Sequence, residues 1–119
     1  AMAGYLTTHV LDIARGCPAK GIEIVLNRID ATGSHPVARS RTNADGRTDA
    51  PILAAAEFAT GHYELVFQVG DYLRQSGQVA AEPLFLEEIP IRFGMNDAGA
   101  HYHVPLLLSP FGYSTYRGS

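Results

Sequence analysis

The sequence predicts an all-β fold, a β-sandwich with one short helix. Short stretches that alternate apolar and polar residues, or that are rich in β-branched and aromatic residues, recur along the chain. Turn-forming Gly, Pro, Asn and Asp residues separate them at fairly regular intervals, which is typical of a sandwich. The predicted strands span residues 5–12, 22–29, 37–42, 47–51, 62–69, 84–93, 101–108 and 113–116.

Two of these strands have distinct faces, because side chains alternate along a strand with a period of two. In strand 5–12, the predicted inner face carries Leu6, Thr8 and Val10, and the outer face carries Thr7, His9 and Leu11. In strand 101–108, the inner face carries Tyr102, Val104, Leu106 and Leu108, and the outer face carries His101, His103, Pro105 and Leu107. Apolar residues on an outer face beside histidines suggest an interface between subunits.

The connections follow from local turn chemistry. Residues 30–33, 96–99 and 109–112 read as turns, and the Asp-Gly pair in residues 43–46 predicts a hairpin into strand 47–51. Pro51 limits that strand to an edge or marks a strand end, and Pro90 interrupts strand 84–93. We expect a connection or a single turn at residues 52–60. The predicted helix spans residues 71–78, with Asp71 as its N-cap and Gly77 at its end.

Composition bounds the class of protein. The 119 residues predict a single domain over residues 1–119, with residues 1–4 as an expression remnant or a disordered start. Apolar residues make up 46%, charged residues 18%, and the net charge is −3, so we expect a soluble protein that binds neither nucleic acid nor membranes. The single Cys17 cannot form an internal disulfide. We expect a cytoplasmic protein, although a signal peptide removed earlier would leave no trace.

Three blocks of the sequence are distinctive. They are residues 6–12 with 16–19 (LTTHVLD and GCPA), residues 42–47 (TNADGR), and the C-terminal HYHVPLLLSP with the closing YRGS. Together they resemble the signatures of the 5-hydroxyisourate hydrolase family of transthyretin-related proteins. The resemblance runs from about Leu6 to Ser119, and the closing tetrapeptide is its most discriminating part, because transthyretin lacks that ending and the histidines.

The resemblance implies a transthyretin-like β-sandwich of two four-stranded sheets with one short helix, and a homotetramer built as a dimer of dimers. It also implies hydrolysis of 5-hydroxyisourate to 2-oxo-4-hydroxy-4-carboxy-5-ureidoimidazoline in urate degradation, without a metal or other cofactor. The family's catalytic set falls on His9, Arg47 and His103, with Tyr116 and Ser119 binding substrate from the tail. Histidine suits proton transfer near neutral pH, and arginine suits stabilisation of negative charge.

Other classes of function stay open at this point. His9, His101 and His103 could form a His₃ zinc site. A non-enzymatic carrier could bind a small aromatic molecule in the channel that the resemblance places between the dimers of the tetramer, and an adhesion sandwich is the plainest alternative. On spacing alone, His9 reads as a surface residue and Arg47 as a solvated turn residue.

Overall fold

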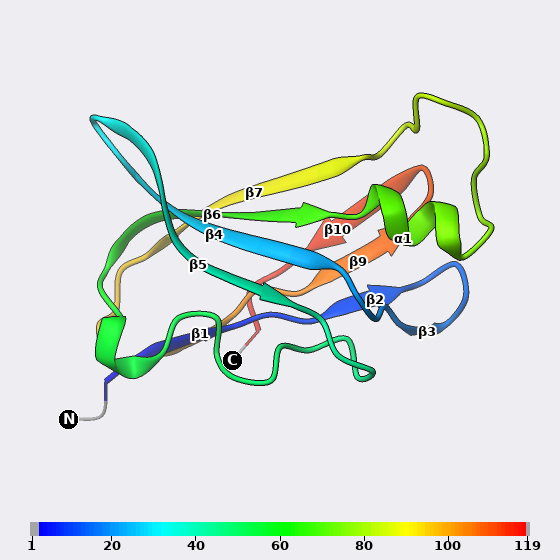
Figure 1. Ribbon diagram of the computed structural model, residues 1–119. Helices are drawn as coiled ribbons and strands as arrows, with labels where there is room; N and C mark the ends of the chain where they lie inside the picture. The colour runs from blue at the N-terminus through cyan, green and yellow to red at the C-terminus, as the bar shows by residue number, and fades with distance from the viewer. Residues whose placement is uncertain (1–2, 119) are drawn as a thin grey trace.

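The protein is a sandwich of two β-sheets with a short helix at one end (Figure 1). The computed structural model describes residues 3–118. One sheet has the strand order β5–β4–β6–β7, and the other has the order β10–β9–β2–β3. The first consists of β4 (Glu23–Asp30), β5 (Gly33–Arg41), β6 (Gly61–Gln68) and β7 (Glu88–Met95). The second consists of β2 (Val10–Asp12), β3 (Cys17–Pro18), β9 (Leu106–Ser109) and β10 (Gly112–Thr115). The predicted fold class is confirmed.

Two further strands continue the second sheet beyond a break. β1 (Tyr5–Thr7) pairs in parallel with β8 (His101–His103), just as β2 pairs in parallel with β9. The predicted strand 101–108 is thus divided at Val104 and Pro105, and Pro105 has no N–H to give to a ladder. Backbone hydrogen bonds still cross the break, from the Val104 N–H to the Thr7 carbonyl and from the Leu106 N–H to the His9 carbonyl.

The core lies between the sheets and follows the predicted alternation. The inner-face residues of strands 5–12 and 101–108 are all buried, whereas Thr7, His9, Leu11, His101, His103 and Leu107 on the outer face are partly exposed. Pro105 is the exception to the predicted alternation: the pattern assigns it to the outer face, but it is buried, because the strand breaks at this position. The opposite sheet contributes fully buried side chains, among them Ile24, Leu26, Leu65 and Phe67. Because the inner face of the two strands is committed to the core, their outer face is free to build a site.

The hairpins differ in part from the prediction. β5 begins at Gly33, so the turn at residues 31–32 is a tight hairpin in which Asp30 accepts the Thr32 N–H. The predicted strand 47–51 is wrong. Residues 43–46 do form a turn, but no strand follows, and Arg47 makes only a single bridge to His9. The Thr48 hydroxyl bonds the Ala50 carbonyl and turns the chain away from a ladder.

Two other boundaries also move. β7 begins at Glu88 rather than Leu84, and Pro90 does not interrupt it, because β7 is an edge strand in the described sheet and the missing N–H faces no partner. The helix α1 covers Gly70–Gln75, and Asp71 does not cap it, because its carboxylate accepts a hydrogen bond from Arg74 instead. Gly77 ends the helix as expected, with a positive φ of 74°.

The connection at residues 52–60 holds a single 3₁₀ turn, η1 (Ala55–Glu57), as expected. Among residues 3–118, no helix has both the length and the apolar character needed to span a bilayer.

Candidate active site

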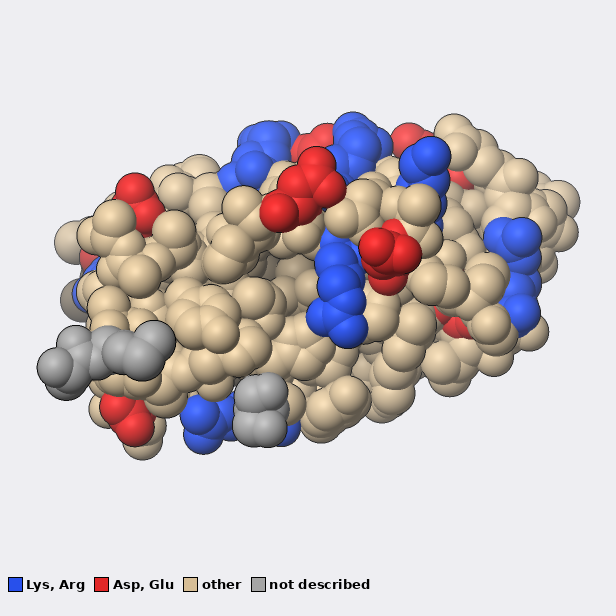
Figure 2. All heavy atoms as spheres, turned by 90° about the horizontal axis from the view of Figure 1, so that it is seen from below, with Lys and Arg blue, Asp and Glu red and all other residues tan. Residues whose placement is uncertain are grey.

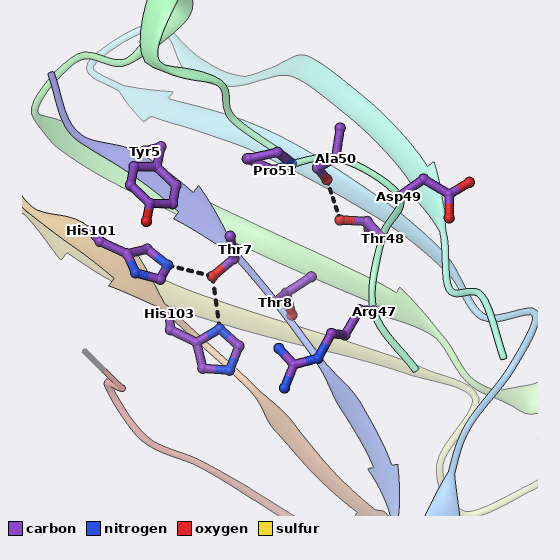
Figure 3. A pocket seen from close by; sticks show the side chains of 10 residues that line it. All are labelled: Tyr5, Thr7, Thr8, Arg47, Thr48, Asp49, Ala50, Pro51, His101 and His103. Carbon is purple, nitrogen blue, oxygen red and sulfur yellow. Dashed lines mark hydrogen bonds between the residues drawn. The ribbon is translucent and has the colours of Figure 1, made fainter. Parts of the chain in front are cut away.

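A threonine and two histidines meet on the outer face where β1 pairs with β8. The parallel register sets Tyr5 beside His101 and Thr7 beside His103. The Thr7 hydroxyl lies 2.7 Å from His101 Nε2 and 2.8 Å from His103 Nδ1 (Figure 3). The Tyr5 ring stacks on the His101 ring with centroids 4.1 Å apart and planes 8° from parallel. Residues that are almost a hundred positions apart in the sequence therefore form one compact cluster.

His9 joins this cluster from the break after β1. Its backbone bridges Arg47, and its ring centroid is 6.5 Å from that of His103. His9 Nε2 lies 2.8 Å from the Asp45 carbonyl oxygen, which can only accept, so Nε2 carries the hydrogen and Nδ1 keeps the lone pair. Gly46 permits this contact: its φ is +75°, and a Cβ there would collide with the Val10 carbonyl and approach His9 Cδ2 to 3.1 Å.

A cavity of about 430 Å³ opens between the histidines and the loop that carries Arg47. The Arg47 guanidinium extends across it toward His103 (Figure 3). The lining residues are Tyr5, Thr7, Thr8, Arg47, Thr48, Asp49, Ala50, Pro51, His101 and His103. Seen from below, the molecular surface consists mostly of uncharged residues and is hollowed near its centre (Figure 2). This volume suits a small planar molecule rather than a polymer.

Both His9 and His103 are tuned toward the neutral form. Burial lowers the pKa of His9, and the positive charge of Arg47 lowers it further. Burial is also the largest cause of the lowered pKa of His103, followed by Arg47 and then by His101 and His9. A neutral imidazole keeps a lone pair that can accept a proton at neutral pH, and a fixed arginine can stabilise negative charge beside it.

The C-terminal tail lies against His103 through its backbone. The Gly118 N–H donates to the His103 carbonyl at 2.7 Å, and the Arg117 guanidinium lies over the Tyr102 ring, 4.2 Å from its centroid. Tyr116 is not among the residues that line the histidine cavity. It is 56% exposed and lines a different hollow beside Tyr102 and β7. Ser119 lies outside the described residues.

The structure thus brings together three of the residues that the sequence predicted for the site, His9, Arg47 and His103. Sequence reasoning missed Thr7 and Tyr5, and it considered His101 only as a zinc ligand. The alternation of strand 5–12 did assign Thr7 to the same face as His9. The parallel register with β8, which turns that face into a contact with His101 and His103, cannot be read from either strand alone.

The zinc hypothesis finds no support in the geometry. Among residues 3–118, no three His, Cys, Asp or Glu side chains are grouped so that they could hold a metal ion. His101 and His103 direct a ring nitrogen each at the Thr7 hydroxyl rather than at a shared point in the cavity.

The model of the HIUase/Transthyretin family matches residues 6–118. The chain belongs to this family. It is 60% identical over 119 residues to 5-hydroxyisourate hydrolase of Mesorhizobium japonicum, covering 100% of this chain and 95% of that protein. It is 57% identical over 117 residues to 5-hydroxyisourate hydrolase 2 of Rhizobium meliloti, covering 98% of each.

Solved structures with the same fold include two that differ in their reported function. A crystal structure of (S)-allantoin synthase matches with a TM-score of 0.92 and 44% identity, covering 99% of this chain but 44% of that longer one. Sea bream transthyretin in complex with thyroxine matches with a TM-score of 0.83 and 27% identity, covering 95% of this chain and 93% of that one. The family therefore includes both named hydrolases and a protein solved with a bound hormone, and the chemistry of the cavity has to distinguish the two.

Proposed function

We propose that this protein hydrolyses 5-hydroxyisourate to 2-oxo-4-hydroxy-4-carboxy-5-ureidoimidazoline. The observation that carries the proposal is the cavity in which Arg47 faces His103, with the His9 ring packed near His103 just outside the cavity lining. Opening a cyclic amide needs a base for water, stabilisation of the oxyanion and a proton for the leaving nitrogen. The full-length relatives named as 5-hydroxyisourate hydrolases support the choice of substrate.

In the proposed mechanism, His103 is the general base. It removes a proton from water as the oxygen bonds to C6 of the substrate, and its lowered pKa keeps it neutral and ready to accept that proton. Arg47 orients the ring and stabilises the negative charge that develops on the C6 oxygen. The N1–C6 bond then breaks, and the protonated His103 returns the proton to N1. His9, with its lone pair at Nδ1, helps to position the water.

The tail residues have a supporting role in this proposal. Tyr116 and Ser119 close the pocket and bind the substrate. Because Tyr116 lines another hollow within one subunit, its part in the site depends on a change in the tail or on a neighbouring subunit.

We also propose a homotetramer, a dimer of dimers, with the cavity facing a channel between dimers. Leu11 and Leu107 are register partners on the outer face that carries the histidines, and Ile13, which follows β2, is 55% exposed. A second sheet packed on this apolar strip would bury it and enclose the cavities. A cytoplasmic location is part of the same proposal, supported by the free, unbridged Cys17.

The competing function is a non-enzymatic carrier of a small aromatic molecule. The similarity to sea bream transthyretin, which was solved in complex with thyroxine, is the reason to consider it. The residues that line the cavity argue against a carrier, because binding an apolar ligand there would desolvate an arginine and two histidines with no gain in affinity.

The test is to generate 5-hydroxyisourate in situ from urate with uricase and to follow its ultraviolet decay. The wild-type protein should accelerate the decay above the spontaneous rate, and EDTA should leave the acceleration unchanged if the reaction needs no metal. His103→Asn, which can still reach Thr7, should lose it. His35→Asn, an exposed position on β5, is the matched control and should keep it. A folded wild-type protein that gives no acceleration but binds thyroxine would replace the hydrolase with a carrier.

A further inference from the structure

The Thr7 hydroxyl joins two histidines of the cavity. It lies within hydrogen-bond distance of His101 Nε2 and His103 Nδ1, and among residues 3–118 the structure gives it no other side-chain or backbone partner. A hydroxyl carries one hydrogen to donate and two lone pairs to accept. The three groups must therefore share their hydrogens in a coordinated way.

The single hydroxyl hydrogen restricts the protonation of the two rings. If both facing nitrogens carried lone pairs, one of them would lack a donor. If both carried hydrogens, the hydroxyl hydrogen would lack an acceptor. Both contacts and the hydroxyl hydrogen are satisfied when one ring donates to Thr7 and Thr7 donates to the other. Two directions of this hydrogen-bond chain remain: His103 donates to Thr7 and Thr7 to His101, or His101 donates to Thr7 and Thr7 to His103.

Arg47 selects between the two directions. His103 Nδ1 is engaged with Thr7, so Nε2 is the nitrogen left for the cavity, and the Arg47 guanidinium lies on that side of the ring (Figure 3). A guanidinium is always charged and can only donate, so it favours a lone pair on the facing nitrogen over an N–H. With the lone pair on Nε2, Nδ1 carries the hydrogen and donates to Thr7, and Thr7 donates to His101 Nε2.

The Tyr5 ring holds His101, the last acceptor of the hydrogen-bond chain, in place. It stacks face to face on His101, with 4.1 Å between centroids and 8° between planes, which fixes the plane of the acceptor ring. The β1–β8 register aligns Tyr5 with His101 and Thr7 with His103, so the stack and the hydrogen bonds are set by the same pair of strands.

We propose that Thr7 is a positioning residue that holds His103 in the Nδ1–H tautomer, with His101 Nε2 as the acceptor of the Thr7 hydroxyl hydrogen. This inference rests on the proposed function. In the reaction, the lone pair of His103 Nε2 takes a proton from water while the water oxygen forms its bond to C6. The resulting imidazolium keeps the Nδ1–H bond to Thr7, and the Nε2 proton leaves with N1. Thr7 and His101 end the cycle with the hydrogens with which they began.

Substitution of Thr7 tests the proposal through activity. Thr7→Val keeps the shape and removes the hydroxyl, so we expect kcat to fall by about 10- to 100-fold, a part of the contribution of a general base, with little change in KM. Thr7→Ser should remain within about threefold of wild type, because the hydroxyl returns. Thr32→Val is the matched control: it removes a threonine hydroxyl 2.8 Å from His35 Nε2 on a distant hairpin, and it should leave kcat unchanged.

The tautomer can be measured without any reaction, by long-range ¹H–¹⁵N NMR of the histidine rings in the intact protein. We expect wild-type His103 to show a protonated Nδ1 and an unprotonated Nε2, and Thr7→Val to show a mixture or the opposite tautomer. A wild-type His103 with its hydrogen on Nε2 would overturn the inference even if the enzyme is active. An inactive wild type with the expected tautomer would refute the proposed function and leave the tautomer assignment standing.

A double-mutant cycle tests the role of His101 and covers the case in which Thr7→Val does not fold. His101→Phe keeps a ring for Tyr5 to stack on but offers no acceptor, so the Thr7 hydrogen becomes free to turn toward His103 Nδ1. We expect His101→Phe to lose about as much kcat as Thr7→Val. The double variant should lose little more, because both changes break the same hydrogen-bond chain. Additive losses, or a wild-type kcat in His101→Phe, would contradict the proposal.

Discussion

Gly118 offers a sharp test of how closely His103 is held. A Cβ built on Gly118 would lie 2.9 Å from His103 Cδ2 and 3.2 Å from His103 Cβ. Carbon atoms in favourable contact stay about 3.5–4.0 Å apart, so Gly118→Ala requires a relative shift of roughly 0.6–1 Å. Either the His103 ring moves, or the tail lifts and weakens the 2.7 Å hydrogen bond from the Gly118 N–H to the His103 carbonyl.

A displacement of this size matters for a general base, because a misplacement of about 1 Å can cost on the order of 100-fold in rate. We therefore expect Gly118→Ala to lower kcat by roughly 10- to 100-fold in the uricase-coupled decay assay, which corresponds to about 1.4–2.7 kcal/mol of activation free energy. The midpoint of thermal unfolding should change little, because Gly118 lies near the end of the chain and outside the core.

Gly112 provides the matched control in the same C-terminal segment. A Cβ there would lie 3.7 Å from Ser109 Oγ, which is an ordinary contact, so Gly112→Ala should keep both activity and stability. If Gly118→Ala has the kcat of wild type, the close packing of the tail on His103 has no part in catalysis, and the argument fails. If both variants lose activity equally, the effect belongs to the hairpin as a whole rather than to the histidine.

Three other predictions follow from particular contacts. Arg47→Gln should raise the pKa of His103, because the positive charge that lowers it is gone. The acid limb of the kcat–pH profile should therefore move to higher pH, while kcat itself falls by about 10²–10³. An acid limb at the wild-type pH, or an unchanged His103 pKa in an NMR titration, would contradict this. Tyr72→Phe removes a 2.6 Å hydrogen bond to the buried carboxylate of Asp12 and should lower the free energy of unfolding by about 1.5–3 kcal/mol in a urea titration. Leu107→Glu places a charge on the apolar outer strip and should reduce the mass measured by light scattering from a tetramer toward a dimer; an unchanged mass would show that this strip is not the interface.

The alternation of residues along two strands allowed much of this protein to be predicted. Because side chains on a strand alternate strictly, the pattern from Leu6 to Val10 fixed which residues enter the core and left His9 on the outer face. The same reasoning assigned His103 to the outer face of its strand. The sandwich, the helix terminated at Gly77 and the C-terminal hairpin are likewise local consequences of pattern and turn chemistry.

Local patterns were less reliable where a strand needs a partner. Residues 47–51 look like a short strand after an Asp-Gly turn, yet Arg47 makes only one bridge and then turns away. Pro90 looks like an interruption, but at the edge of a sheet the missing N–H costs no ladder bond. In both cases the outcome depends on what lies beside the segment, which the segment itself does not encode.

The sequence by itself determined the sandwich, its family and the chemical character of the candidate site, because periodicity and motif are properties of neighbouring residues. Only the tertiary structure decided which side chains of that site contact one another. The parallel pairing of β1 with β8 joins Thr7 to His101 and His103 across more than ninety positions, and it leaves Tyr116 at a different hollow. Such a register is selected by the burial of both inner faces at once, so it exists only when the whole chain has folded.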